Sequence, residues 1–272
     1  SLDYVAELVL NKKKLVSEKF PDTNEFYRRA WLEDTQTYLE YALKDVELIV
    51  EIDETNFCSE AILSLQRLLK APFDACFYAS HMGSIYFMRN AWWKCKTGKR
   101  VDKREEYEGA MIYDPLSEDT NGLHLNVAAF DFAGLYPSMM IARNISFETK
   151  SDEPTELGVN ILTPRDFSET TRTKMLYYKT DELGLLPRAV IELKELRNEY
   201  KRLMREARES DNGEYAKWHN NQMAVKRLMA SFYGIVAFQG FGWADVDLAA
   251  SITASAREAI RLAAFKAKEM EA

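Results

Sequence analysis

Apolar side chains recur every three or four residues in the stretch 32–52, at Leu39, Leu43, Val46, Ile49 and Val50. This spacing places them on one face of an amphipathic α-helix. A second helix is predicted over 59–71, with Ser59 as its N-cap and an end before Pro72.

Two longer helical patterns follow one another from Pro187. The first runs to a turn signal at Asp211–Gly213, and the second continues to Gly234. Proline is favoured in the first turn of a helix and glycine just beyond its end. Each stretch is about 30 Å long at the rise of an α-helix, so the pattern predicts an antiparallel helical hairpin. A further, Ala-rich helix is predicted over 247–272.

Two short strands are predicted between these helical regions, in "GAMIYDP" (109–115) and "LHLNVAAFDF" (123–132). Asp131 ends the apolar run of the second strand, and Pro137 follows at a predicted helix start. The carboxylate is either a cap between strand and helix or a ligand aimed at a metal ion. Residues 147–186 are polar and weakly patterned, which predicts loops with short elements.

Composition indicates a folded protein with more than one subdomain, because 272 residues at 47% hydrophobic content can bury a sizeable core. No apolar run is long enough to span a membrane. The three cysteines are odd in number and widely spaced, which argues against a disulfide framework. We therefore expect a cytoplasmic protein with no membrane partner.

The net charge of −7 argues against nucleic acid, but phosphates respond to local patches. Ten Lys/Arg face seven Asp/Glu between Arg188 and Arg227. Arg197 and Lys201 share one helix face, and Lys226 shares another with Ala230 and Tyr233. If these faces meet, their cations suit a polyphosphate; the alternative is two solvated surfaces.

Five short motifs occur in the order found in family B DNA polymerases. "DFAGLYPSMM" (131–140) resembles the D-x-x-S-L-Y-P-S signature, and "KRLMASFYG" (226–234) is similar to K-x-x-x-N-S-x-Y-G. "YEGA" (107–110) looks like the Y-x-G-G/A motif, "YALKD" (41–45) like the third exonuclease motif, and "LKELRNEYK" (193–201) like the first fingers helix. "SLDYVAEL" and "ARNISFET" look most like the T-even bacteriophage branch.

This resemblance implies a helix-rich α/β (α+β) fold with a partial palm sheet and a long two-helix fingers hairpin. It implies template-directed nucleotidyl transfer from a dNTP to a primer 3′-hydroxyl by a two-metal mechanism, with Mg²⁺ as cofactor. The implied units are the tail of a 3′→5′ exonuclease domain (1–57), a helical connector (58–106), the first part of the palm (107–182), the fingers hairpin (183–239) and a truncated return to the palm (240–272).

The resemblance also assigns roles to individual residues. Asp131 and the backbone carbonyl of Phe132 would bind the catalytic metal, and Asp45, in the motif that begins at Tyr41, would bind an exonuclease metal. The dNTP would be bound by Leu135, Tyr136, Arg197, Lys201, Lys226, Ala230 and Tyr233. The primer–template DNA would be contacted by Tyr107, Gly109 and Gly234.

The chain departs from the family pattern at two residues, and it lacks some of the family's motifs. Gly134 replaces a serine, which we expect to loosen the turn, and Ala230 replaces an asparagine near the nucleotide. The D-T-D motif does not occur after Gly234, nor do the earlier exonuclease motifs occur. We therefore expect activity to require a complementary C-terminal palm and thumb segment, which could also contact a sliding clamp. The alternative is a catalytically inert nucleotide- or DNA-binding module.

Overall fold

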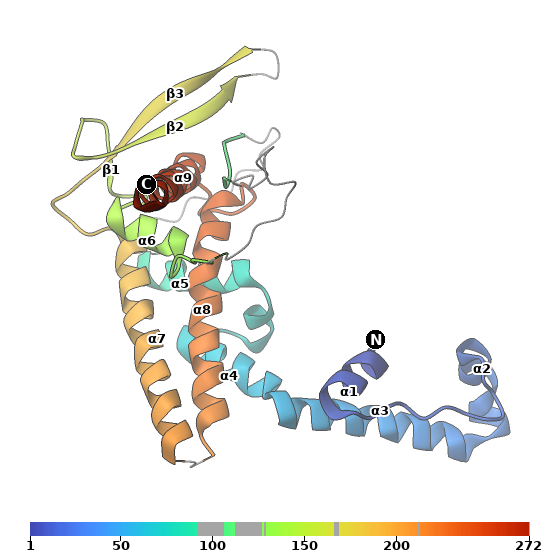
Figure 1. Cartoon of the computed structure of the whole chain (residues 1–272). Helices are drawn as coiled ribbons and strands as arrows, with labels where there is room; N and C mark the ends of the chain where they lie inside the picture. Colours follow the sequence, from blue (N-terminus) through green and yellow to red (C-terminus); the bar gives the residue numbers. More distant parts are fainter. Residues whose placement is uncertain (92–105, 112–126, 128, 166–168, 211–212, 272) are drawn as a thin grey trace.

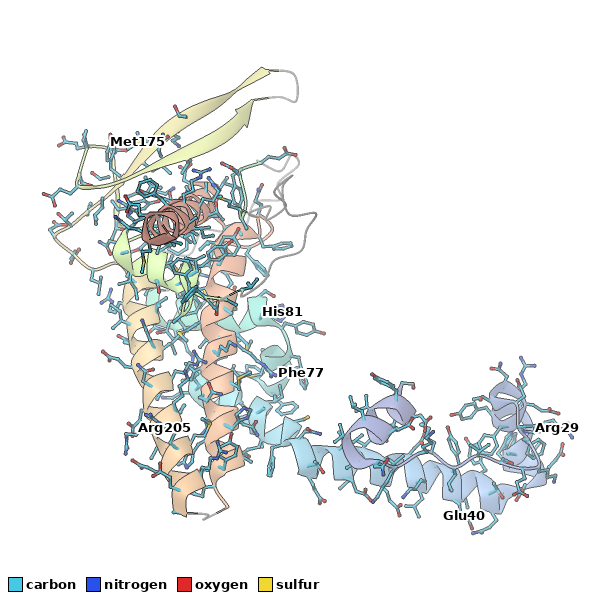
Figure 2. All side chains as sticks on the ribbon, viewed as in Figure 1. Arg29, Glu40, Phe77, His81, Met175 and Arg205 are labelled. Carbon is cyan, nitrogen blue, oxygen red and sulfur yellow. The ribbon has the colours of Figure 1, made fainter. Side chains whose placement is uncertain are left out.

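The computed structural model describes residues 1–91, 106–111, 127, 129–165, 169–210 and 213–271. Its first helices form an arm that projects from the body of the molecule (Figure 1). The arm consists of α1 (Leu2–Leu10), α2 (Thr23–Glu33) and the long α3 (Thr35–Asn56). Arg29 and Glu40 lie near its far end (Figure 2).

The helix predicted over 32–52 is confirmed as α3, but its boundaries differ from the prediction, and α1 and α2 were not predicted. Asp34 ends α2 and caps α3, since its side chain accepts a hydrogen bond from the amide of Thr37. The apolar stripe of α3 is exposed rather than buried, with Leu43 at 60% and Val46 at 58% exposure. The arm instead has a small core of its own, made by Phe20, Phe26, Ala30, Tyr38 and Tyr41.

The next helices pack on the body. These are α4 (Cys58–Leu69), the 3₁₀ turn η1 (Phe73–Phe77) and α5 (Ala79–Ala91). The predicted N-cap at Ser59 is wrong, because α4 already begins at Cys58, after Phe57 in the left-handed conformation. The predicted end before Pro72 is confirmed.

The predicted helical hairpin is present. It pairs α7 (Leu185–Ser210) with α8 (Tyr215–Ala237), and the two helices lie side by side and antiparallel (Figure 1). Gly234 does not end α8, because its carbonyl accepts a hydrogen bond from the amide of Phe238. The central position of α8 explains its buried side chains, which contact α4 and α5 on one side and α7 on the other.

A three-stranded antiparallel sheet replaces the loops predicted for 147–186. Its order is β1 (Lys150–Ser151), β3 (Glu169–Tyr178), β2 (Leu157–Arg165). Val159 and Ile161 alternate with an exposed Asn160, and the sheet packs on α9 (Val246–Glu271). The hydroxyl group of Tyr178 donates a hydrogen bond to the hydroxyl oxygen of Ser251 on α9, at 2.7 Å.

The two strands predicted over 109–115 and 123–132 are wrong where they can be compared. Residues 109–111, 127 and 129–132 have no strand conformation, and the remaining positions lie outside the described residues. Phe130 is 95% exposed. A strand needs a hydrogen-bonded neighbour, and within the described part of the chain no strand pairs with these residues. The helix predicted next is present as α6 (Leu135–Ala142), with Pro137 in its first turn.

The fold class is confirmed: helices dominate, with one small sheet. Most of the core is continuous and surrounds α8, where Leu228, Phe232 and Ile235 are completely buried. Among the described residues, no helix combines the length and apolar character needed to cross a bilayer.

Candidate nucleotide and nucleic-acid site

Arg197 and Lys201 of α7 and Lys226 of α8 are near enough for their charges to interact. The positive charge of Arg197 is the main cause that lowers the pKa of Lys201, and burial and the charge of Lys226 lower it further. Arg197 donates a hydrogen bond from Nε to the side-chain oxygen of Gln222 at 3.2 Å, which links α7 to α8. No carboxylate of the described residues forms an ion pair with any of these cations. The cluster therefore has an unbalanced positive charge that suits a phosphate group.

A tyrosine cluster lies at the C-terminal end of α8. The ring of Tyr233 lies 4.6 Å from the ring of Tyr136 on α6, measured between centroids. Its hydroxyl oxygen lies 2.9 Å from that of Tyr107, which belongs to the irregular segment 106–111. Burial raises the pKa of Tyr233, and the hydrogen bond to Tyr107 raises it further. Residues far apart in the sequence thus meet at one aromatic surface.

Arg257 of α9 holds the segment that carries Tyr107, and the sequence analysis missed it. Its Nη1 donates to the carbonyl oxygens of Glu108 at 2.7 Å and Gly109 at 2.6 Å. Its Nη2 lies 2.9 Å from a carboxylate oxygen of Glu108. Burial lowers the pKa of Arg257, which is 4% exposed. The sequence does contain one signal for this role, because Arg257 stands within the Ala- and Ser-rich stretch of α9. An arginine that is buried among such small residues requires hydrogen-bond or ion-pair partners.

Asp131 and Phe132 lie exposed in the irregular segment before α6, and Leu135 is the first residue of that helix. Gly134 has a φ angle of +74°, which glycine adopts without strain. It therefore fits the turn instead of loosening it.

A pair of metal ions requires several oxygen ligands at one place. The described residues contain no group of three or more histidine, cysteine, aspartate or glutamate side chains that could hold a metal ion. Asp131 and one carbonyl are too few ligands for two Mg²⁺ ions. These residues by themselves do not form a two-metal site.

Asp45 and Tyr41 lie on α3 in the arm, separate from the residues above (Figure 1). The ammonium group of Lys14 lies 2.8 Å from a carboxylate oxygen of Asp45 and 3.2 Å from the hydroxyl of Tyr41. That hydroxyl also lies 3.1 Å from the hydroxyl of Tyr27. The carboxylate of Asp45 is therefore neutralised by a lysine, and among the described residues it belongs to no group of three or more side chains that could hold a metal ion.

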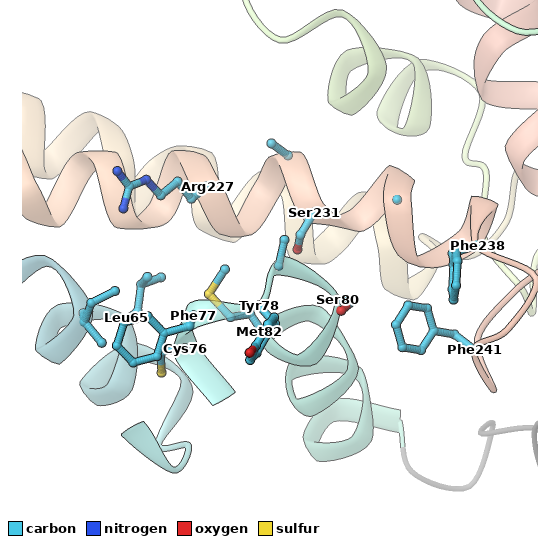
Figure 3. A pocket seen from close by; sticks show the side chains of 14 residues that line it. Leu65, Cys76, Phe77, Tyr78, Ser80, Met82, Arg227, Ser231, Phe238 and Phe241 are labelled. Atoms are coloured by element: carbon cyan, nitrogen blue, oxygen red, sulfur yellow. The ribbon is translucent and has the colours of Figure 1, made fainter. Parts of the chain in front are cut away.

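Ala230 and Gly234 lie on a different face of α8 from the tyrosine cluster. Both line a cavity of about 910 Å³ between α8, α4, η1 and α5 (Figure 3). The structure therefore groups the predicted residues into five places: the cation cluster, the tyrosine cluster beside α6, the cavity face of α8, the exposed Asp131 segment and the arm.

Comparison with known proteins places the chain in a family. The family model of "DNA polymerase family B" matches residues 80–271, well over half of the chain. A DNA polymerase of Archaeoglobus fulgidus is 34% identical and aligns with 99% of this chain and 32% of its own length. A DNA polymerase of Paramecium bursaria Chlorella virus NY2A is 26% identical over 99% of this chain and 30% of its own.

The fold agrees with this match. The family B DNA polymerase of Pyrobaculum calidifontis has a similar structure, with a TM-score of 0.69 at 22% identity, over 99% of this chain and 34% of that protein. The chain thus spans about a third of the length of these relatives. The chain belongs to DNA polymerase family B.

Proposed function

We propose that this chain is the nucleotide-binding part of a DNA-directed DNA polymerase. The observation that carries the proposal is the cluster of Arg197, Lys201 and Lys226, which have no described carboxylate partner. A triphosphate supplies the negative charge that this cluster lacks, and guanidinium groups bind phosphate oxygens in pairs. The aromatic surface of Tyr136 and Tyr233 offers a flat contact for the sugar and base of the same nucleotide.

The remaining roles follow from the family. We assign Leu135 and Ala230 to the dNTP site, and Tyr107, Gly109 and Gly234 to the primer–template DNA. Arg257 holds Tyr107 and Gly109 in place through the carbonyl groups of that segment. The proposed units are the exonuclease tail (1–57), the connector (58–106), the first part of the palm (107–182), the fingers (183–239) and the return to the palm (240–272).

The proposed reaction is nucleotidyl transfer from a dNTP to the 3′-hydroxyl of a primer. Magnesium ions, when bound, would activate that hydroxyl and neutralise the leaving pyrophosphate. Asp131 and the carbonyl of Phe132 supply part of the ligand set, so we propose that a complementary palm segment supplies the rest. This chain binds and orients the nucleotide with its cation and tyrosine clusters. A sliding clamp as partner, a T-even phage relationship and a cytoplasmic location also remain predictions.

A second candidate is a catalytically inert nucleotide- or DNA-binding module. Two observations favour it: Asp131 has no neighbouring metal-binding cluster among the described residues, and Ala230 lacks the amide of the family motif. Both candidates bind a dNTP through the cation cluster. They differ only in whether the chain can take part in catalysis.

Primer extension distinguishes the two candidates. The chain is assayed with Mg²⁺ and dNTPs, alone and with a separately expressed palm–thumb segment that carries the D-T-D motif. Extension only in the mixture, and its loss in Asp131→Ala, is the expected result for the polymerase. No extension in either sample, with dNTP binding retained, identifies the inert module.

The binding step is tested by itself with Arg197→Gln and the matched control Arg208→Gln on the same helix. We expect the first change to weaken dNTP binding at least about tenfold, because a charge-assisted contact to phosphate is lost. The control should bind as the wild type does. Equal affinities for all three proteins would contradict the assignment of the cation cluster.

A further inference from the structure

The first turn of α7 begins inside the protein, where water does not reach its amide groups. Leu185 is 7% exposed and Leu186 is completely buried. The first amides of an α-helix have no partner within the helix, and a buried amide needs one. Gly184, which precedes the helix, has no side chain that could accept their hydrogen bonds. The partners must therefore come from another part of the chain.

A single segment, residues 144–150 after α6, supplies these partners, and we call it the anchor segment. The amide of Leu185 donates a hydrogen bond to Oε1 of Glu148 at 2.5 Å. The amide of Leu186 donates to Oγ of Ser146 at 3.2 Å, and that hydroxyl donates to Oε2 of Glu148 at 2.8 Å. A carboxylate thus lies at the positive end of the helix dipole, where negative charge is stabilising.

The anchor segment also lies directly against the backbone that leads into α7. Asn144 accepts a hydrogen bond from the amide of Gly184 at 2.9 Å and donates one to the carbonyl oxygen of Glu182 at 2.8 Å. A Cβ atom at Gly184 would lie 2.5 Å from Cβ of Ser146 and 2.9 Å from Cγ2 of Thr149. Asn144, Ser146 and Thr149 are at most 6% exposed, so they have little room to move away. The start of the hairpin is therefore fixed to this segment.

The same segment holds the other end of the hairpin, where α8 leads into the turn 238–245. Lys150 donates from Nζ to both carboxylate oxygens of Asp245, at 2.7 and 2.8 Å. The amide of Asp245 donates to the carbonyl oxygen of Val236 at 2.9 Å, which ties the turn to the end of α8. The ring of Phe147 lies 5.7 Å from that of Trp243 in the turn, measured between centroids. One short segment thus contacts both ends of the hairpin.

We propose that Glu148 and Lys150 are positioning residues of the nucleotide site, because they hold the two ends of the hairpin beside α6. The cation cluster lies on the hairpin, whereas Tyr136 and Asp131 lie on α6 and just before it (Figure 1). This inference rests on the proposed function, since it assigns to the anchor segment the spacing between these two groups. When either hold is lost, the hairpin moves relative to α6, and a nucleotide no longer contacts both groups at once.

Hydrogen exchange of the full chain, followed by NMR, tests the hold on α7 without any nucleotide. In Glu148→Ala the amide of Leu185 loses a hydrogen bond to a charged group, so its exchange should be at least about tenfold faster. Glu148→Gln keeps a side-chain oxygen at this place and should restore most of the protection. The matched control Glu153→Ala removes an exposed carboxylate beyond β1, and the exchange of Leu185 should then equal that of the wild type.

The hold on the turn after α8 is tested in the same way. Lys150→Met removes the ammonium group that binds Asp245, so the amide of Asp245 should exchange faster than in the wild type. Lys179→Met is the matched control, because Lys179 is exposed and lies beside the anchor segment. It should leave the exchange of Asp245 unchanged.

Titration with dATP then tests the positioning role, at a temperature where circular dichroism shows every variant to be folded. Glu148→Ala and Lys150→Met should each bind dATP at least about fivefold more weakly, although neither side chain belongs to the cation cluster. Glu148→Gln and the two controls should bind within about twofold of the wild type. A residue that only stabilised the fold would leave the affinity of the folded protein unchanged.

The two measurements separate this inference from the proposed function. A wild type that binds no dATP refutes the proposed function; faster exchange in Glu148→Ala would then still support the hold on α7. The inference is overturned if Glu148→Ala leaves the exchange of Leu185 unchanged or if Glu148→Gln does not restore its protection. It is also overturned if the wild type binds dATP and folded Glu148→Ala and Lys150→Met bind it equally well.

Discussion

Gly83 determines how closely α5 approaches α8, and its replacement gives the sharpest test of the packing. A Cβ atom at this position would lie 1.6 Å from Cδ1 and 3.0 Å from Cγ1 of Ile235. Ile235 is completely buried, so its side chain has little room to move away. Gly83→Ala therefore introduces an overpacked contact into the main core.

The expected magnitude combines two opposing effects. Overpacking a core costs about 1–3 kcal/mol, whereas replacing glycine by alanine inside a helix contributes about 1 kcal/mol. Gly83→Ala should thus lower the free energy of unfolding by about 1 kcal/mol. Gly234→Ala is the matched control: it is also helical but has open space, so it should raise the free energy of unfolding by about 1 kcal/mol.

Urea denaturation at 25 °C measures both variants. Ile235→Val removes the Cδ1 atom of the overpacked contact, so the double variant Gly83→Ala/Ile235→Val should be more stable than the sum of the single changes predicts. The interaction energy should be about 1 kcal/mol. If Gly83→Ala stabilises the protein as much as Gly234→Ala does, or if the two changes are additive, the close packing of α5 on α8 is refuted.

Three further predictions concern the candidate site. Arg257→Met should lower the free energy of unfolding, measured by urea denaturation, by about 3 kcal/mol, because it removes two charge-assisted hydrogen bonds, to the carbonyl oxygens of Glu108 and Gly109. A loss below about 0.5 kcal/mol would contradict this. Tyr233→Phe should lower the free energy of unfolding by about 1 kcal/mol, and so should Tyr107→Phe. The double variant should lose no more than either single variant, because both changes remove the same hydrogen bond; additive losses would argue against this hydrogen bond. Lys201→Met should raise the free energy of unfolding near pH 7 by about 0.5 kcal/mol, because the charge of Arg197 disfavours a charged Lys201. This gain in the free energy of unfolding is complete at pH values below the lowered pKa of Lys201, where the lysine is charged in the folded protein. It should vanish above the ordinary lysine pKa of 10.5, where the lysine is neutral in both states, and urea titrations across that pH range would detect the change.

Much of the helical structure could be predicted from local pattern. The period of apolar residues and the turn at Asp211–Gly213 predicted the hairpin, because both signals act within a few neighbouring residues. Helix ends were less accurate: Gly234 resembles a terminator, yet the packing of α8 in the core extends the helix to Ala237. The motifs also identified the family.

The sheet and the strands could not be predicted reliably, because a strand depends on a distant partner. Val159 and Ile161 are buried only because α9 covers them, whereas the more apolar segment around Phe130 remains exposed. The same reason explains the stripe that includes Leu43 on α3, which periodicity marks as apolar but which no described element covers. A pattern shows which face is apolar, and tertiary packing decides whether it is buried.

The sequence by itself determined the long hairpin, several other helices and the family, since these depend on neighbouring residues and on motif spacing. Only the tertiary structure decided that Tyr107, Tyr136 and Tyr233 meet, and that Arg257 holds the segment of Tyr107 from a separate helix. It also decided that the charges of Arg197 and Lys226, on two different helices, both lower the pKa of Lys201. Such contacts join distant parts of the chain, and their geometry exists only after the helices have packed together.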